Sequence, residues 1–324
     1  MMIPSFDQAV QRDGYAWWYL DAISDDGDLG LTVIAFIGSV FSPYYAWQRA
    51  RSKGNPFNHC AINVALYGRR GRWSMTERGE SALCRNATSL RIGPSGLRWT
   101  GSSLLIDIEE WAFPLPRRIR GQIRIHPLIG NSITIALDQE KRHNWTPIWP
   151  EARVEVDLLT PSLNWSGEGY FDHNTGIEPL EKAFNSWHWS RAVTSSGPVV
   201  LYDTSDCGGR RAIHALHFSR DGSRSELEPS PEVSLPSSGW RIARSTRSDS
   251  GRARLKATWE DTPFYARSLI HTRLLGEEVT AVHESLSLPR FCAPLVQLML
   301  PFRMPRRSNW SGSNDGEADK ANDG

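Results

Sequence analysis

The chain has 324 residues, with 37 basic and 36 acidic side chains and a formal net charge of +1. This balance argues against a nucleic-acid-binding protein, which carries a large basic excess, and the length predicts two domains. The four cysteines include no CxxC pair, which is typical of a reducing compartment and argues against disulfides or a metal cage. We find neither a signal peptide pattern nor a run of about 18 apolar residues, so we expect a cytoplasmic protein.

The first half of the chain reads as a series of short strands. Two β-rich runs flank the Asp-Gly turn at residues 25–28, which is a hairpin signal. Later segments, such as SLLIDIEE and QIRIHP, alternate apolar and polar residues, as strands with one solvated face do. Helical periodicity is scarce before EPLEKAFNSW (178–187), where we expect one short helical turn. The first half is therefore predicted to be an antiparallel β-barrel or sandwich.

The second half loosely repeats the pattern of the first. In residues 17–36 and again in residues 187–203, closely spaced tryptophans precede a polar turn with a glycine and an apolar strand. Such internal similarity predicts two β-barrel-like modules in tandem, and we place the boundary near Thr160-Pro161. The expected fold is all-β with little helix, with an N-terminal domain at 1–161 and a C-terminal domain at 162–307. The tail 308–324 has too few apolar residues to form a core and is predicted to be disordered.

Two short constellations flank this predicted boundary, His143-x-Trp145 and Tyr170-x-Asp172. Because side chains alternate along a strand, each pair lies on one face of its strand. If the two faces meet, an acid, a base and two aromatic rings converge in an apolar cleft between the domains, which is a favoured place for a ligand. The chain has 14 tryptophans. Most are explained by packing, but Trp149, Trp187 and Trp189 are candidates, with Trp145, for lining a long apolar pocket.

Several blocks of the sequence resemble one known family. They include GYFD (169–172), WHWSRA (187–192), the run 30–47, MTERG (75–79) and PLPRR (114–118). In this order they are similar to the acyclic carotenoid 1,2-hydratases, also called hydroxyneurosporene synthases, densely over residues 14–205. The resemblance implies paired lipocalin-like domains and an acyclic carotenoid substrate such as neurosporene or lycopene. It further implies addition of water to the terminal C1–C2 double bond without a cofactor.

Hydration of an unactivated alkene begins with protonation of carbon, and a carboxyl group in an apolar site has a raised pKa and can donate that proton. By matching the family motifs, the resemblance assigns this role to Asp172. It places Trp145 and Tyr170 beside the cation, and His143 where it orients Asp172 or accepts a proton from the attacking water. Without the resemblance, an aspartate near glycine and asparagine more often caps a turn, and a lone histidine is more often structural.

Two other functions use the same features. A lipocalin-like isomerase or cyclase of polyenes or terpenoids would need the same acid, and a non-catalytic carotenoid carrier would need only the pocket. A buried carboxyl is costly to desolvate if it is ionised, which favours catalysis over carriage. A carotenoid dissolves in lipid, so we expect peripheral contact with the inner or intracytoplasmic membrane. We expect neither a metal nor a nucleic acid as a partner.

Overall fold

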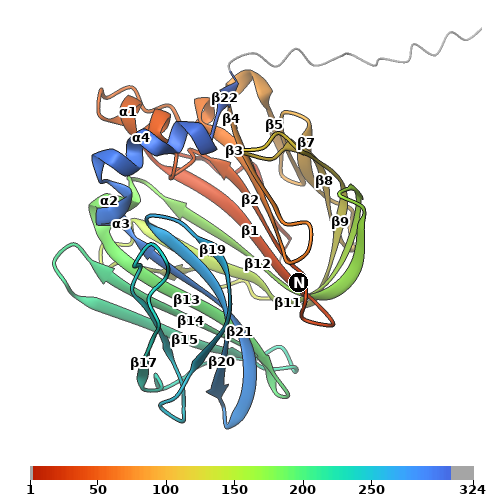
Figure 1. Cartoon of the computed structure of the whole chain (residues 1–324), viewed down its shortest axis with the longest axis vertical. Helices are drawn as coiled ribbons and strands as arrows, with labels where there is room; N and C mark the ends of the chain where they lie inside the picture. Colours follow the sequence, from red (N-terminus) through yellow and green to blue (C-terminus); the bar gives the residue numbers. More distant parts are fainter. Residues whose placement is uncertain (1–2, 308–324) are drawn as a thin grey trace, which may run out of the picture.

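The computed structural model describes residues 3–307. More than half of the chain is β-strand, nearly all of it paired antiparallel, and little is helix, which confirms the predicted all-β class. The larger sheet has 13 strands (Figure 1). Its strands follow the order β22 (Arg306–Arg307), β4 (Arg72–Arg78), β3 (Cys60–Tyr67), β2 (Gly30–Ile37), β1 (Tyr15–Ser24), β12 (Leu163–Gly176), β11 (His143–Thr160), β9 (Arg118–Ile129), β8 (Leu104–Trp111), β7 (Ser95–Trp99), β6 (Ser89–Ile92) and β5 (Leu83–Asn86), with β10 (Ile135–Ala136) beside β11.

A smaller sheet of seven strands follows in the chain, and two further strands pair with each other. The smaller sheet has the order β16 (Arg224–Glu226), β15 (Arg211–Phe218), β14 (Gly197–Asp206), β13 (Phe184–Thr194), β21 (Glu277–Ser287), β20 (Tyr265–Leu274) and β19 (Arg254–Asp261). The separate pair is β17 (Glu232–Leu235) and β18 (Arg244–Arg247). The helical segments are α1 (Pro43–Arg49), α2 (Leu180–Ala183), α3 (Leu288–Phe291), α4 (Pro294–Arg303) and the 3₁₀ turns η1 (Pro56–Asn58) and η2 (Glu80–Ala82). The short turn expected in EPLEKAFNSW is α2.

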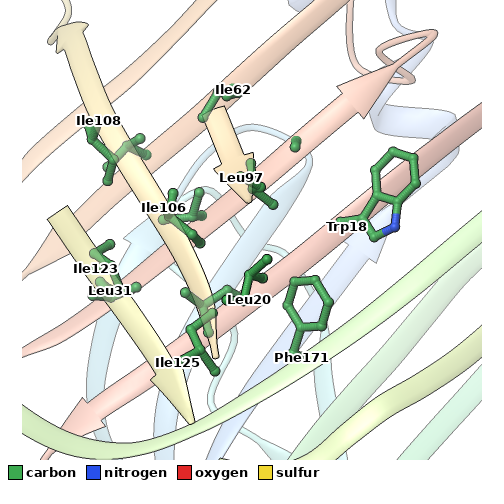
Figure 2. Close-up of a cluster of buried hydrophobic side chains, with 14 of the residues drawn as sticks. Trp18, Leu20, Leu31, Ile62, Leu97, Ile106, Ile108, Ile123, Ile125 and Phe171 are labelled. Atoms are coloured by element: carbon green, nitrogen blue, oxygen red, sulfur yellow. The ribbon is translucent and has the colours of Figure 1, made fainter. Parts of the chain in front are cut away.

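Strand β1 lies near the middle of the larger sheet, and every one of its residues is buried. Because side chains alternate, Trp18 and Leu20 point into the curl of the larger sheet, where they join an apolar core with Ile106, Ile123 and Phe171 (Figure 2). Residues Tyr15, Trp17 and Tyr19 point the other way, into a second core. The sequence WWYL therefore belongs to a strand buried on both faces, which suits a continuous run of large apolar residues.

The second core lies between the two sheets. It combines Trp17 and Tyr170 of the larger sheet with Trp189 and Val282 of the smaller one. The larger sheet also curls back on itself, since the backbone N–H of Phe113, just after β8, donates to the carbonyl of Trp73 in β4 over 2.9 Å. The smaller sheet packs a third core against its opposite face. The functional residues predicted from sequence lie mostly in the core between the sheets.

The predicted boundary at residues 161/162 falls inside the hairpin that joins β11 to β12, and both strands belong to the larger sheet. In the sequence, the change from the larger to the smaller sheet comes between Gly176, the end of β12, and Phe184, the start of β13. Near the C-terminus, β22 returns to the larger sheet beside β4. The division of the chain into two tandem domains stays a prediction. The predicted disordered tail, 308–324, lies outside the described residues.

Candidate active site

Asp172 is brought to the centre of the molecule by β12, which pairs with β1 on one side and β11 on the other. Tyr170, Asp172 and Asn174 alternate with Phe171 and His173, so the first three face the smaller sheet. Tyr19 is directly opposite Asp172 on β1, and Trp145 is directly opposite Asn174 on β11. The two sequence pairs therefore share one face of the larger sheet, as their spacing predicts.

The carboxyl group of Asp172 accepts three hydrogen bonds. Its Oδ2 accepts from the indole Nε1 of Trp145 over 2.9 Å and from the hydroxyl of Tyr170 over 2.9 Å. Its Oδ1 accepts from the amide of Asn174 over 3.0 Å. Trp145 and Tyr170 are also within 3.1 Å of each other through the same polar atoms. Both rings donate hydrogen bonds to Oδ2, a contact that the sequence allowed for Tyr170 but not for Trp145. Their expected place beside a carbocation stays a prediction.

Burial raises the pKa of Asp172 well above the ordinary value of an aspartate. The hydrogen bonds from Tyr170 and Trp145 oppose this effect because they stabilise the carboxylate, and the negative charges of Glu284 and Asp21 add to it. Desolvation is the largest of these causes, since only 4% of the residue is exposed. The carboxyl group is thus held in its protonated form to a higher pH than a free aspartate, as a proton donor requires.

A cavity of about 40 Å³ lies directly beside Asp172. A cavity of this size holds a water molecule or a few carbon atoms. Five aromatic rings dominate its wall, together with Asn174 and the carboxyl groups of Asp172 and Glu284; the rings are those of Trp17, Tyr19, Trp187, Trp189 and Tyr202. The sequence prediction of Trp187 and Trp189 as pocket residues thus agrees with their positions.

A larger pocket of about 260 Å³ adjoins this cavity and shares Trp17, Tyr19, Trp187 and Glu284 with it. Most of its lining is apolar, and it includes residues of β2, β3 and β4 as well as the C-terminal helix α4. Trp240 and Met299, whose side chains are exposed, also line it. The larger pocket and the cavity beside Asp172 therefore share a wall, and we refer to the two adjoining spaces together as the passage.

Glu284 is a second buried carboxyl group at the cavity, and sequence analysis did not single it out. It lies on β21, directly opposite Trp189, which is in turn opposite Tyr202 on β14. Its Oε1 accepts from the Tyr19 hydroxyl over 2.6 Å and pairs with the guanidinium of Arg267. Burial raises the pKa of Glu284, while the positive charge of Arg267 lowers it. Asp172 has no such cation among the causes of its pKa shift.

His143 lies on the same face as Trp145 but is occupied elsewhere. Its Nδ1 is 2.8 Å from the Tyr15 hydroxyl, and its Nε2 is 3.5 Å from a carboxylate oxygen of Glu178. The ring also packs edge-on against Phe184, with the centroids 5.0 Å apart. Burial lowers the pKa of His143, against the opposing effect of nearby acidic groups. The polar contacts of His143 are thus to Tyr15 and Glu178, and its two expected roles, orienting Asp172 or accepting the proton of the water, stay predictions.

Trp149 lies on the opposite face from Trp145, although the two are four positions apart and strict alternation would put both on one face. The pairing of β11 with β12 shifts register twice, once before and once after Trp149, and such bulges reverse the facing of the side chains that follow. Trp149 stacks on Phe171 inside the curl of the larger sheet, 4.8 Å between centroids. Its predicted role in substrate binding has no support from this arrangement.

Within residues 3–307, no group of three or more His, Cys, Asp and Glu side chains is arranged to hold a metal ion. None of the helices in this part of the chain has the length and apolar character needed to cross a membrane.

Comparison with known proteins agrees with these features. The sequence profile of the family described as carotenoid hydratase CrtC matches residues 33–313. The chain belongs to this family. The chain is also 57% identical to the acyclic carotenoid 1,2-hydratase of Thiocapsa roseopersicina and 48% identical to that of Rubrivivax gelatinosus; each match covers 94% of this chain and 76% of the relative. The family resemblance inferred from the sequence blocks is therefore confirmed.

A solved structure extends the comparison to the fold. An AttH protein from Nitrosomonas europaea superposes with a TM-score of 0.56 at 12% identity, covering 88% of this chain and 99% of the other. At this level of identity the match concerns the fold alone, and it agrees with the predicted lipocalin-like class.

Proposed function

We propose that this carotenoid hydratase family member adds water across the terminal C1–C2 double bond of an acyclic carotenoid, with Asp172 as the proton donor. One observation carries the assignment of Asp172: a carboxyl group with a raised pKa lies at the end of an apolar passage, facing a small cavity walled by aromatic rings. The names of the Thiocapsa and Rubrivivax relatives support the substrate class. Neurosporene and lycopene are the substrates we expect.

The first step transfers the proton of Asp172 to C2 of the alkene. The π electrons form the new C–H bond, which leaves a tertiary cation at C1 and a carboxylate at Asp172. Because Oδ2 already accepts two hydrogen bonds, Oδ1 is the oxygen that carries the transferable proton. As the carboxylate forms, the bonds from Trp145 and Tyr170 strengthen, since hydrogen bonds to ionised acceptors are the stronger ones.

The cation then lies among the rings of the cavity wall, each of which stabilises a nearby positive charge by about 0.5–2 kcal/mol. These rings also exclude bulk water, which limits the nucleophiles to those the cavity admits.

In the second step, a water oxygen bonds to C1, and the water must lose a proton. Glu284 is the better placed acceptor, because it lines the cavity while both nitrogens of His143 face other groups. Arg267 favours the ionised form of Glu284, and burial without a cation favours the protonated form of Asp172. Burial raises the pKa of both carboxyl groups, but Arg267 opposes the rise at Glu284 and no cation opposes it at Asp172. Glu284 is therefore the better base of the two and Asp172 the better acid. The predicted role of His143 in accepting this proton stays untested.

The dimensions of the passage suit a terminal double bond. The inner cavity of about 40 Å³ accepts only the end of a long molecule, and the larger apolar pocket receives the chain that follows. We further propose peripheral contact with a membrane, since an acyclic carotenoid is dissolved in lipid and must enter this passage from it.

The test is incubation of the purified protein with lycopene in detergent, followed by mass spectrometry of the pigment. The proposed hydratase yields a product heavier by one water molecule. An isomerase or cyclase would give a product of unchanged mass with a new retention time. A carrier would return the same pigment, with only a shifted absorbance while bound; either of these results would overturn the proposal.

A further inference from the structure

Helix α4 presents an unusual face to solvent. Its residues Leu295, Leu298, Met299 and Phe302 are spaced along one side of the helix and are 69%, 68%, 39% and 79% exposed. Val296 and Leu300 on the other side are buried. The helix PLVQLMLPFR is therefore apolar on both sides, with Gln297 and Arg303 as its polar residues. A surface helix of a globular protein usually presents charged and polar residues to water. The exposed apolar side of α4 therefore indicates a surface that contacts a binding partner.

The apolar surface continues onto helix α1. Trp47 of α1 is 59% exposed, and a shallow groove lined by Tyr44, Trp47, Gln297 and Pro301 joins the two helices. They lie next to each other at one corner of the molecule (Figure 1). We call the exposed side chains of Trp47, Leu295, Leu298, Met299 and Phe302 the α1–α4 face. Contiguous apolar surface of this kind marks an interaction site.

The same face borders the entrance to the passage. Met299 belongs both to the α1–α4 face and to the lining of the larger pocket. Its helix neighbours Val296, Leu300 and Arg303 also line the pocket. Trp240, which is 46% exposed, lines the pocket too. An apolar molecule that moves from the α1–α4 face past Met299 therefore enters the passage to Asp172 without crossing a polar surface of helix α4.

Cations surround this apolar face. The guanidinium of Arg51 lies 3.6 Å from the centroid of the Trp47 ring and is exposed. Lys53 is exposed close by in the chain, and Arg307 is exposed just after α4. Arg303 is the last residue of α4, its side chain is 40% exposed, and its guanidinium forms an ion pair with Glu260. An apolar helix face with Trp and flanking Arg or Lys is the arrangement that binds the interface of an anionic bilayer.

We propose that the α1–α4 face is a docking surface for a bilayer that contains anionic lipid, and that it aligns the entrance of the passage with the lipid phase. This inference rests on the proposed function, which requires a substrate dissolved in lipid, and it adds the surface through which the substrate is taken. The charge of the flanking residues and the continuity with the pocket both favour a lipid bilayer over a second copy of the chain as the occupant.

The test is flotation of the full-length protein with vesicles of phosphatidylcholine and phosphatidylglycerol. Wild-type protein should float with these vesicles, and the double variant Leu298→Asp/Phe302→Asp should bind at least about tenfold less. Neither of these two residues lines the pocket. Leu159→Asp is the matched control, since Leu159 is 66% exposed and lies at the end of β11 next to the β11–β12 hairpin. This variant should bind as wild type does.

Activity separates the docking proposal from the proposed function. With lycopene in detergent, the double variant should turn over as wild type does, and with lycopene in vesicles it should lose activity in parallel with binding. A wild-type protein that is active in detergent but does not float, or a double variant that floats fully, would overturn the docking surface alone. If the wild type dimerises and the double variant is monomeric without a change in vesicle binding, the face is an interface between copies, which would also overturn it. A wild-type protein without hydratase activity on lycopene in detergent would instead contradict the proposed function.

Discussion

At the scale of single residues, the decisive feature is that burial raises the pKa of Asp172, which favours its protonated form where a carboxylate would be poorly solvated. Its Oδ2 accepts from Trp145 and Tyr170, and its Oδ1 accepts from Asn174, which lines the cavity with Asp172. The acid is thus positioned by three neutral donors, and no cation is among the groups that shift its pKa. Such surroundings keep the proton in place until an alkene accepts it.

Replacing Asp172 with asparagine should reduce turnover by about 10²–10⁴-fold, the usual contribution of a general acid. The fold should survive, because the amide is nearly isosteric. The folded state raises the pKa of Asp172, so the unfolded chain releases this proton first as the pH rises above about 4. The contribution of Asp172 to the free energy of unfolding of the wild type therefore falls as the pH rises. The variant should not show this pH-dependent contribution. Urea unfolding of both proteins at pH 5 and pH 8 measures it; a variant that is active, or that unfolds more readily than wild type at pH 8, would be evidence against this account.

Replacing Tyr170 with phenylalanine tests the hydrogen bond to Oδ2. This bond lowers the pKa of Asp172, so its loss should raise that pKa further and move the alkaline limb of the pH–activity profile to higher pH. Turnover at the optimum should fall by about tenfold, because the carboxylate left after proton transfer has lost a donor. Trp145→Phe should shift the limb in the same direction. A limb that moves to lower pH would exclude the assigned role of this bond.

Sequence reasoning reached part of the site. The x-spaced pairs placed Trp145, Tyr170 and Asp172 together because alternation within a strand is a local property. The other carboxyl group at the cavity, Glu284, lies more than a hundred residues from Asp172 in the sequence. Nothing in the sequence of its strand distinguishes it from the other glutamates there. Its position depends on how the two sheets face each other. His143 was brought to the correct face, but which group it would contact depended on Tyr15 from the start of the chain.

At the scale of elements, the two sheets are joined by a buried ion pair. Arg191 of β13 reaches across to Asp21 of β1, with Nε 2.7 Å from Oδ1, and neither side chain is exposed. A second contact runs from Arg191 to Glu168 of β12 over 3.0 Å. The Tyr19 hydroxyl is 3.1 Å from Asp21 and 2.6 Å from Glu284, so the pair is connected to the cavity.

Arg191→Leu should lower the free energy of unfolding by about 3–5 kcal/mol, because it leaves the carboxylate of Asp21 buried without its partner. The double variant Arg191→Leu/Asp21→Asn removes both charges and should recover a large part of this loss. Urea denaturation of the three proteins measures both values. If the double variant were less stable than the single one by the full cost of a second independent substitution, the coupling between the sheets would be absent.

Element prediction succeeded where the pattern was local. The alternation in the first half and the single helical turn before β13 were both recovered. Two features escaped it. The bulges around Trp149, which reverse the facing of β11, coincide with Pro147 and Pro150. Proline inside a strand is a signal for a bulge, which the prediction from sequence did not use. Helix α4 has no amphipathic period to detect, since both its buried and its exposed sides are apolar.

At the scale of the whole molecule, two buried neutral imidazoles couple the fold to pH. Burial lowers the pKa of His173, which stacks on Trp18 in the core of the larger sheet, to about 3, and it lowers the pKa of His283 in the smaller sheet to about 3 as well. The unfolded chain binds these protons below about pH 6.5 while the folded chain does not. Stability should therefore decline as the pH falls from about 6.5 toward 3.

Each of these histidines should contribute a slope of up to about 1.4 kcal/mol per pH unit over that range. The variant His173→Phe keeps an aromatic ring against Trp18 and should show a shallower decline, with little change at pH 8. Thermal or urea unfolding between pH 4 and pH 8 measures the two slopes. Equal slopes in wild type and variant would mean that His173 is protonated in the folded state.

The arrangement of the whole molecule was the hardest to obtain from sequence. The repeated tryptophan–turn pattern indicated two β modules, and the chain does form two large sheets. The boundary was set by the proline at 161, yet that residue lies in a hairpin within the larger sheet. The sheet that a strand joins is decided by contacts with distant strands, as β12 with β1 and β22 with β4 show. A local turn signal cannot separate a hairpin from a boundary between sheets.

The most direct test of the central claim is hydration of lycopene in deuterated water by wild-type protein and by Asp172→Asn, with the product analysed after its hydroxyl group has exchanged back in ordinary water. The account predicts that wild type places one non-exchangeable deuterium on the carbon next to the new alcohol, and that the variant forms almost no product. Wild-type hydroxylated product without carbon-bound deuterium, or labelled product from the variant at the wild-type rate, would contradict it.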